Sequence, residues 1–404
     1  MYHNTLIVGG GVAGLHTGIE LAKKGITCCI VDEYNCGGRV QTYHPPLQEK
    51  IHWENGAGRI HSSHHRTLQY LKKYKCTMIP LSDKIDYYSK GEMHPNLFFD
   101  IHRGFLRSLR TLSPRILSTK TLKEIIVDVM PHARHFYQSF PYYAEMNTLR
   151  ADHALELFTG EIGAHDGFFV CKEGLSTMIQ HMKDEFISLG GTIIEHTRVK
   201  SVESVNHLIF LHCTPHNENE TVTYCGLRCV LAIPRDSLEK LLRIPSVMGV
   251  IRHLKTVPLL RMYAVFDEPW FADLNSTVMD NEIRYLIPIS KNVIMISYTE
   301  GPYASHWMRM PHEKVEKIVM TDIRRLFPDR TIPDPVYFKM HPWRQGCTYW
   351  LPGNYSIDEM SHKILNPKKN IFVCGESYAV NQCWIESAIE HADELLSHPN
   401  FVKA

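Results

Sequence analysis

The sequence lacks the features that mark membrane-spanning or secreted proteins. The 404-residue chain has no run of eighteen apolar residues, and its first predicted strand begins at residue 5, which leaves no room for a signal peptide. The tail from His398 to Ala404 is short and polar, so a C-terminal membrane anchor is not expected. These absences predict a cytoplasmic protein without a membrane partner.

An excess of charge of one sign is also absent. Lysine and arginine number 44 against 43 acidic residues, which gives a net charge of +1. Binding to nucleic acid through bulk charge is therefore not expected. The hydrophobic content of 44% is ordinary for a globular protein, and the length suffices for two domains. We expect a monomer or homodimer whose partners are small molecules.

Paired cysteines are missing as well. The chain has eleven cysteines without a C-x-x-C pair, which favours reduced thiols over a disulfide framework. Histidines are abundant, and His61, His64 and His65 cluster in the stretch RIHSSHH. No cysteine or carboxylate lies at ligand spacing, so we predict no metal site there. We interpret the stretch as a helix start capped by Ser62 or Ser63.

The most informative stretch of the chain covers residues 5–39. Its aliphatic and β-branched start, Thr5–Val8, predicts a short buried strand. Gly9, Gly11 and Gly14 then form the pattern G-x-G-x-x-G. That spacing permits a tight turn, close approach of the backbone to a pyrophosphate, and close packing of a helix on a strand.

A helix and a second strand follow the glycines, as a dinucleotide-binding unit requires. Apolar residues from Val12 to Ala22 recur at helical spacing, and Gly25 marks the stop. Ile26–Val31 is the predicted second strand. Asp32 and its neighbour Glu33 end this strand, about twenty residues after the glycines. An acidic side chain in this place can accept hydrogen bonds from an adenosine ribose.

A second glycine turn lies just beyond the acidic residues. Gly37, Gly38 and Arg39 form it, and an NAD-binding unit has no need of such a turn. A chain that wraps a whole FAD molecule does, with Gly38 in the turn and Arg39 as a fork-shaped phosphate donor. The motif therefore favours FAD.

With these residues the sequence resembles the flavin-containing amine oxidase family, which includes monoamine, polyamine and L-amino acid oxidases. The resemblance is strongest in residues 5–62 and 369–396 and fair in 165–270. It implies an α/β fold, in which a Rossmann-like FAD-binding domain carries an inserted α+β substrate domain. The implied FAD-binding domain comprises residues 1–78, 165–235 and 340–404, and the substrate domain comprises 79–164 and 236–339.

The resemblance also implies further cofactor contacts. Gly56 and Ala57 match the segment that lies against the flavin ring, and a larger side chain there would occupy the space of the ring. Val199 matches a backbone contact to the adenine half. The remaining implied contacts lie near the end of the chain, at Gly375, Glu376, Trp384 and Ile385.

On the substrate side, the resemblance implies an aromatic pair and a lysine that holds a water near the flavin. Trp384 matches one aromatic, and Tyr349 or Trp350 could supply the other, although each could equally be a core residue. Arg261 stands at the position of the lysine, with Lys255 as the alternative if the strand is shifted by six residues. Arginine stays charged and cannot act as a base. A buried arginine needs a carboxylate partner, which the substrate itself could supply.

Cys347 lies where monoamine oxidases carry a cysteine bonded to the flavin, although the spacing to Pro352 is shorter here. We expect non-covalent FAD, with a link through Cys347 as the alternative. The implied reaction is oxidation of a C–N bond of an amine or amino acid, with O2 as acceptor. Arg261 keeps two other hypotheses open: a non-amine reaction on the same fold, and a flavin-holding protein without turnover.

Several longer patterns predict secondary structure outside the glycine-rich start. Residues 175–186 show helical spacing of apolar side chains, and Thr192–Val205 alternates like a single strand. Leu259–Phe266 predicts a strand with Leu260, Met262, Ala264 and Phe266 on one face and Arg261, Tyr263 and Val265 on the other. A helix is predicted to begin near Trp384.

Overall fold

The computed structural model describes residues 2–47, 51–89, 91–94, 106–128, 143–159, 167–218 and 220–403. The chain divides into two compact units. Unit 1 comprises Met1–Pro80, Gly167–Lys255 and Tyr355–Ala404, and unit 2 comprises Leu81–Asp166 and Thr256–Asn354.

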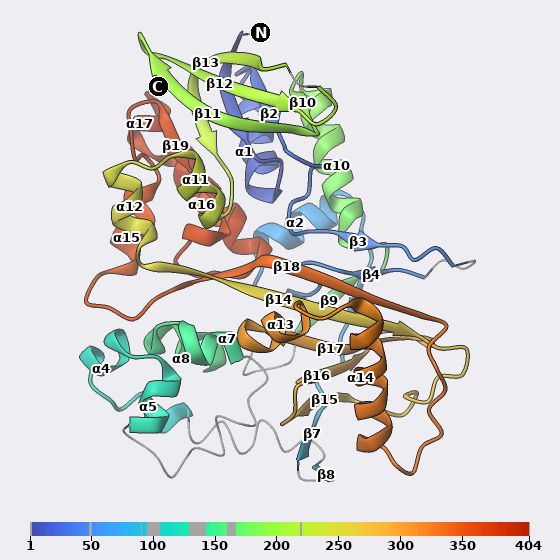
Figure 1. Ribbon diagram of the computed structural model, residues 1–404. Coiled ribbons are helices and arrows are strands. Elements are labelled where there is room, and N and C mark those ends of the chain that lie inside the picture. Colours follow the sequence, from blue (N-terminus) through green and yellow to red (C-terminus); the bar gives the residue numbers. More distant parts are fainter. Residues whose placement is uncertain are drawn as a thin grey trace. The chain divides into compact units, whose positions relative to one another are not determined.

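Unit 1 is built around a seven-stranded sheet with the order β10-β2-β1-β13-β12-β11, in which β19 also pairs with β13. Its strands are β1 (Tyr2–Val8), β2 (Cys28–Val31), β10 (Thr192–Ile194), β11 (Thr197–Val205), β12 (Leu208–Pro215), β13 (Val222–Leu231) and β19 (Ile371–Val373). In Figure 1 these strands run from blue through yellow-green to red, so distant parts of the chain share one sheet. The pairs β1–β2, β1–β13, β2–β10 and β13–β19 are parallel, as a doubly wound fold requires.

Helices and two small sheets complete unit 1. The helices are α1 (Val12–Lys23), α2 (His65–Lys73), α10 (Leu175–Ser188), α11 (Arg235–Leu241), α12 (Pro245–Ile251), α15 (Ile357–Ile364), the 3-10 helix η2 (Glu376–Tyr378), α16 (Ile385–Ser397) and α17 (Pro399–Val402). The small sheets pair β3 (Thr42–Tyr43) with β4 (Trp53–Glu54), and β9 (Phe168–Cys171) with β5 (Ile60–His61) and β6 (Met78–Pro80). The apolar faces of α1, α10 and α16 pack with the sheet in one hydrophobic core.

Unit 2 contains a second sheet with the order β18-β14-β17-β16-β15-β7-β8. Its strands are β7 (Ile85–Ser89), β8 (Glu92–His94), β14 (Leu254–Val265), β15 (Ser276–Met279), β16 (Tyr285–Pro288), β17 (Val293–Glu300) and β18 (Tyr337–Trp350). Its helices are α4 (Pro114–Thr119), α5 (Leu122–Asp128), α7 (Tyr143–Thr148), α8 (Ala151–Thr159), α13 (Gly301–Trp307) and α14 (His312–Leu326). The predicted apolar face of β14 lies in the core of this unit: Leu260, Met262, Ala264 and Phe266.

The structure corrects two predictions of local structure. Residues 192–205 form two strands instead of one, because His196 adopts a left-handed conformation with φ of 55°. β10 therefore pairs with β2, whereas β11 pairs with β12. The helix after RIHSSHH begins at His65, and neither Ser62 nor Ser63 caps it. His61 and His64 are instead joined by a hydrogen bond, in which the His61 amide donates to Nδ1 of His64.

The unit boundaries also differ from the expected domain boundaries at two places. Residues 236–255 belong to unit 1 rather than to the substrate part, because α12 packs against α15 and Ser246 donates a hydrogen bond to the Pro367 carbonyl, 2.7 Å away. Residues 340–354 belong to unit 2, since β18 pairs with β14. Cys347 and Tyr349 consequently share a unit with Arg261.

Candidate functional site

The predicted glycine turn joins β1 to α1. Gly9 has φ of 99°, a left-handed conformation that a glycine adopts without strain. A side chain at Gly9 would overlap the Ala232 carbonyl oxygen, and one at Gly14 would overlap the carbonyl oxygen of Gly9. These two glycines are therefore required by the packing of α1 and β13 around the turn.

Gly11 is different, because no atom of another described residue beyond its own chain neighbours lies within 4 Å of a Cβ added to it. Its φ of −70° and ψ of −178° are open to any residue, so neither packing nor backbone strain requires a glycine. The second glycine turn lies beside this position, since Gly11 and Gly37 form a parallel bridge and the Gly37 amide donates to Gly10. The two turns and the start of α1 thus leave open space that suits a pyrophosphate at a helix N-terminus.

Asp32 follows β2 and faces the same glycine turn. Its Oδ2 accepts the Gly10 amide at 2.6 Å, and its Oδ1 accepts the Tyr34 amide at 2.8 Å. Burial raises the pKa of Asp32, while these two hydrogen bonds oppose the rise. An ionised carboxylate has about four lone pairs, so capacity for ribose hydroxyls remains. Glu33 is engaged elsewhere: its Oε1 pairs with Nε of Arg198 at 2.7 Å.

Arg39 and Glu376, two predicted cofactor residues from opposite ends of the chain, form an ion pair at 2.5 Å. Glu376 is buried and also accepts the Cys383 amide at 2.9 Å, while Arg39 is about one-third exposed. Gly375, just before Glu376, has φ of 134° and open space around a Cβ. The pair therefore joins the second glycine turn to the turn after β19.

The segment with Gly56 and Ala57 lies beside Arg39, because the Ala57 amide donates to the Arg39 carbonyl at 2.8 Å. Val199 lies near the other end of the site. It is two residues after Thr197, whose amide donates to the carbonyl of Asp32 at 2.9 Å. The structure thus links segments that are far apart in the sequence within unit 1.

Trp384 is the residue just before α16, and Ile385 begins the helix. The indole lies in a cluster of rings, 4.9 Å from His64 and 6.0 Å from Phe168 between centroids. The guanidinium of Arg59 lies over both Phe168 and Trp384, at 4.7 and 5.7 Å from the ring centroids. Cation–π contact of this kind fixes the orientation of the indole.

In unit 2, Arg261 lies opposite Tyr298 in the pairing of β14 with β17. Its guanidinium is 5.5 Å from the centroid of the Tyr298 ring. The Tyr298 hydroxyl donates to Oε1 of Glu300 at 2.5 Å. Lys255, the alternative to Arg261, is exposed and belongs to unit 1. Tyr298 and Glu300, which both lie on β17, were not among the predicted site residues.

Cys347 and Tyr349 alternate along β18 and therefore share a face of the strand. Tyr349 is buried, with 1% of its surface exposed, and Trp350 is fully buried. The Trp350 carbonyl accepts the Arg150 amide at 3.0 Å. Glu145 of α7 and Tyr298 both interact electrostatically with Cys347, so these groups lie near one another.

Comparison with known proteins decides the family. The family described as flavin containing amine oxidoreductase matches residues 125–394, about two-thirds of the chain, and an NAD(P)-binding Rossmann-like domain matches residues 7–74. The chain belongs to the flavin-containing amine oxidase family. It is therefore an FAD-dependent oxidoreductase, as the glycine motifs predict, with a Rossmann-like nucleotide-binding fold.

Individual relatives of this amine oxidase are distant in sequence. YobN of Bacillus subtilis, which carries the provisional name of an L-amino-acid oxidase, is 21% identical over 95% of this chain and 92% of its own length. A redesigned putrescine oxidase matches with a TM-score of 0.82 at 13% identity, and both chains are fully covered. Wild-type putrescine oxidase bound to putrescine matches with a TM-score of 0.78 at 14% identity, over 98% of this chain and all of that one. These likenesses establish the fold.

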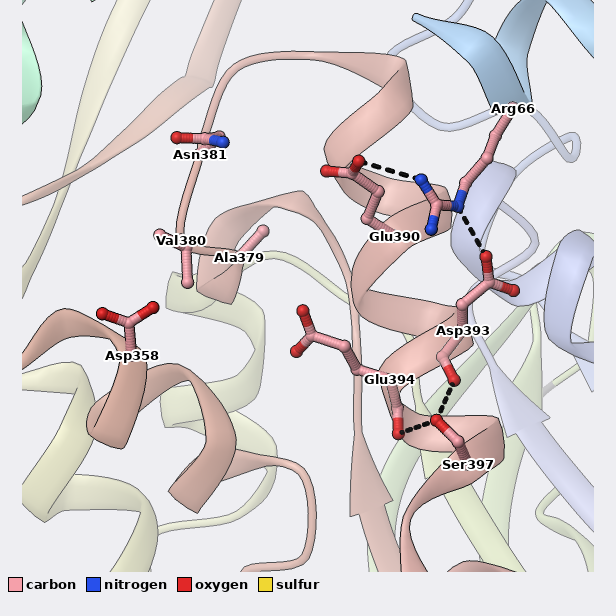
Figure 2. Close-up of a pocket in the computed structure, with 9 residues that line it drawn as sticks. All are labelled: Arg66, Asp358, Ala379, Val380, Asn381, Glu390, Asp393, Glu394 and Ser397. Atoms are coloured by element: carbon pink, nitrogen blue, oxygen red, sulfur yellow. Dashed lines mark hydrogen bonds and ion pairs between the residues drawn. The ribbon is translucent and has the colours of Figure 1, made fainter. Parts of the chain in front are cut away.

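Within the described residues, a pocket of about 420 Å³ opens beside α16 in unit 1 of this amine oxidase. Figure 2 shows Arg66 paired there with Glu390 and Asp393. Asp358 and Glu394 also line the pocket, so carboxylates outnumber the one guanidinium. Such a lining repels a pyrophosphate, and none of the predicted cofactor residues contributes to it. This pocket therefore does not suit the flavin phosphates.

Two further residues that support the site of this amine oxidase were not predicted. Glu386, at the start of α16, accepts the Arg66 and Thr67 amides at 2.9 and 2.8 Å and the Thr67 hydroxyl at 2.8 Å. This buried carboxylate thereby takes the capping role expected of Ser62 or Ser63. Contacts between residues about 320 positions apart leave no signal in the local sequence.

Replacing Glu386 by glutamine should destabilise unit 1. The glutamine amide keeps one acceptor oxygen, but the negative charge is lost and a buried donor of α2 is left unpaired. The free energy of unfolding should fall by about 1–3 kcal/mol. The measurement is urea unfolding followed by circular dichroism. Glu390→Gln, on the same helix, is the control, because its half-exposed ion pair with Arg66 contributes less than about 1 kcal/mol. Equal losses in both variants would contradict the capping role.

His391 is the second such residue, and it holds the turn at Gly375. It is fully buried, and its Nδ1 accepts the Gly375 amide at 3.1 Å while Nε2 donates to the Ser361 carbonyl at 3.3 Å. Burial lowers the pKa of His391 to about 4. The ring is therefore neutral at physiological pH, with its proton on Nε2.

Stability should fall as the pH drops from about 6.5 to about 4. In this range His391 takes up a proton in the unfolded chain but not in the folded one. Up to about 3 kcal/mol of the free energy of unfolding that is present above pH 6.5 is therefore lost on acidification. His341 of unit 2, whose pKa burial lowers to about 3, acts in the same direction. The measurement is urea unfolding at pH 7 and 4.5 for the wild type and His391→Gln. The free energy of unfolding of the variant should fall less between pH 7 and 4.5 than that of the wild type. An equal fall in both proteins would refute the low pKa of His391.

Proposed function

We propose that this protein oxidises a C–N bond of a small amine or amino acid, with O2 as the final electron acceptor. The substrate carbon next to nitrogen loses a hydride and the nitrogen loses a proton, which gives an imine. Water then converts the imine to a carbonyl compound and ammonia or an amine. When bound, FAD supplies the redox chemistry by taking the hydride, and its reoxidation reduces O2 to hydrogen peroxide.

The observation that carries the cofactor part of the proposal is the open space beside Gly11. Around it lie the residues that would hold FAD: the turns at Gly9, Gly14 and Gly38 for the phosphates, Asp32 for the ribose, and the Arg39–Glu376 pair. Glu33, Gly56, Ala57, Val199, Gly375 and Ile385 are proposed to complete the cofactor contacts. Trp384 and Tyr349 are proposed to bound the substrate.

Arg261 is proposed to orient a water or a substrate group through hydrogen bonds and positive charge. Because its guanidinium keeps its proton, it cannot accept one from the substrate. Its guanidinium lies over the Tyr298 ring, whose face attracts a cation. The protein itself therefore supplies part of the stabilisation of this charge.

Anaerobic titration tests the proposed reaction. The purified holoprotein is mixed with diamines, monoamines and L-amino acids while the absorption of oxidised flavin is followed. Bleaching by one of these classes, followed by peroxide formation on admission of air, is the expected result. Flavin that stays oxidised with every amine and amino acid would favour a different reaction on this fold, or a flavin-holding protein, as Arg261 would allow.

Denaturation should release the flavin, because we propose that FAD is held without a covalent bond. After acid precipitation, the yellow colour is expected in the supernatant for the wild type and for Cys347→Ala alike. The measurement is the flavin absorption of both fractions. Colour that remains in the wild-type pellet and leaves the Cys347→Ala pellet would instead establish a link through Cys347.

A further inference from the structure

Unit 1 contains two thiols that lie side by side. Cys76 follows helix α2, and Cys171 is the last residue of strand β9. The pairing of β6 with β9 brings them together: Met78 lies opposite Cys171, and the Lys172 amide donates to the Thr77 carbonyl at 2.9 Å. Side chains two residues apart on a strand share a face, so Cys76 lies diagonally across from Cys171. A hydrogen bond joins the two thiols.

The two thiols differ in their access to solvent. Cys76 is partly exposed, whereas Cys171 is buried. Cys171 belongs to the hydrophobic core of unit 1, and Cys76 packs against that core. The thiols of Cys29, Cys213 and Cys229 also lie near one another, but all three are fully buried. A dissolved oxidant therefore reaches Cys76 more easily than it reaches any of those three.

The surroundings keep the pair reduced in the resting protein. Burial raises the pKa of Cys76, and it raises the pKa of Cys171 to about 12. Because the thiolate is the reactive form, both sulfurs react slowly at neutral pH. Both are free thiols in the structure. Their oxidation consequently needs an oxidant that is stronger than air and sustained contact with it.

The hydrogen of the Cys171 thiol has acceptors in reach. Its Sγ donates to Oε2 of Glu173 at 3.6 Å and to the Gly174 carbonyl at 3.5 Å. The Thr77 amide donates to the same Oε2 at 2.9 Å, and this hydrogen bonding lowers the pKa of Glu173. The Glu173 carboxylate is therefore ionised at neutral pH and lies in place to receive the Cys171 proton.

We propose that Cys76 and Cys171 form a reversible disulfide when the protein meets hydrogen peroxide. The Cys76 sulfur attacks the peroxide, the O–O bond breaks, and the products are a sulfenic acid and one water. The Cys171 sulfur then attacks the Cys76 sulfur, forms the S–S bond and expels the hydroxyl group. The Cys171 proton passes by way of Glu173 to this hydroxyl and gives a second water. Overall, the two thiols lose two electrons and two protons to one peroxide.

The new bond closes a long loop of the chain. β6 ends at Pro80 and β9 begins at Phe168, and between them the chain forms the first segment of unit 2, Leu81–Asp166. The disulfide thus links the strands by which the chain leaves and re-enters unit 1. β6 lies at the edge of its sheet, so Cys76 can approach Cys171 more closely without disrupting other strands. Closing a long loop restricts the unfolded chain and stabilises the folded one.

The inference goes beyond the proposed function, because peroxide from any source gives the same bond. The proposed reaction is one such source, since it releases peroxide from the protein itself.

Peptide mapping of the holoprotein tests the bond. The protein is reduced with dithiothreitol, desalted and treated with hydrogen peroxide, which catalase then removes. Free thiols are blocked with N-ethylmaleimide in denaturant, and the protein is digested and analysed by mass spectrometry without reduction. We expect the peptides of Cys76 and Cys171 to be linked, and dithiothreitol to separate them. Both thiols blocked after peroxide, or Cys76 oxidised to a sulfinic acid beside a free Cys171, would overturn the inference.

Alanine variants assign the roles of the two thiols. In Cys171→Ala, peroxide should leave Cys76 as a sulfenic acid that dimedone traps, because the resolving thiol is missing. In Cys76→Ala, Cys171 should stay reduced. Cys225→Ala removes a partly exposed thiol of β13 and is the matched control, so the bond between Cys76 and Cys171 should form as in the wild type. If a variant fails to fold, the map of the wild type still decides.

Thermal unfolding measures the consequence of the bond. The oxidised wild type should have a Tm about 5 °C or more above that of the reduced protein, and dithiothreitol should abolish this gain. Cys76→Ala treated with peroxide should show no gain. Equal Tm values with the bond in place would contradict the stabilisation. Disulfide formation in a protein that oxidises no amine or amino acid would refute the proposed function alone, whereas substrate turnover with both thiols still free after added peroxide would refute this inference alone.

Discussion

Replacing Gly11 by alanine should leave the fold intact and remove the flavin. Among the residues that the structure describes, none beyond the chain neighbours of Gly11 has an atom within 4 Å of the added Cβ, and the backbone at Gly11 suits any residue. The apoprotein should therefore be as stable as the wild type. The methyl group would occupy the space where the backbone approaches the pyrophosphate. Overpacking of this size costs about 1–3 kcal/mol, which is about 5–150-fold in affinity.

The measurement combines flavin content after purification, a titration of the apoprotein with FAD, and urea unfolding of the apoprotein. Gly249→Ala is the control, because Gly249 also has open space around its Cβ but lies in the short helix α12, where alanine is favoured by about 0.5–1 kcal/mol. The control should keep its flavin. Full flavin retention by Gly11→Ala would show that the pyrophosphate lies elsewhere.

Gly14 shows why the motif alone could not separate these roles. The sequence pattern places Gly9, Gly11 and Gly14 in one motif. In the structure, Gly9 and Gly14 are needed to avoid overlap within the protein, whereas Gly11 is not. The spacing therefore predicted the turn correctly, but only the three-dimensional packing distinguishes a folding requirement from space kept for a ligand.

Local patterns predicted most of the elements, because strands and helices reveal themselves through the period of their apolar residues. The helix α10 and the buried face of β14 followed from this period. The break between β10 and β11 did not, since it depends on the backbone conformation of His196. The limits of the two units were also missed at residues 235 and 340, because long-range packing sets them.

The supporting residues of the site could not be predicted for the same reason. Glu386 and Glu300 act through partners that are distant in the chain, and neither belongs to a motif. Arg261 was identified because it stands at the position of the lysine that the resemblance implies, but its surroundings were not predicted. A lone arginine in a strand gives no indication that the ring of Tyr298 lies beside it.

Replacing Arg39 by alanine should lower both stability and flavin affinity. It leaves the buried Glu376 without its cation, which costs about 3–5 kcal/mol for a fully buried pair. We expect the free energy of unfolding to fall by about 2–3 kcal/mol, because Arg39 is about one-third exposed and solvent weakens the ion pair. The flavin affinity should fall by a further factor of about 10–100, since the variant also lacks a guanidinium donor to the phosphates.

The double variant Arg39→Ala/Glu376→Gln separates these two effects. Glutamine removes the unpaired buried charge and can still accept the Cys383 amide, so urea unfolding should show most of the lost stability restored. The FAD affinity of the double variant should stay low, because the phosphate donor is still missing. If the double variant instead regained wild-type FAD affinity, Arg39 would act only by holding Glu376, and the phosphates would have to be bound by backbone amides of the glycine turns and α1.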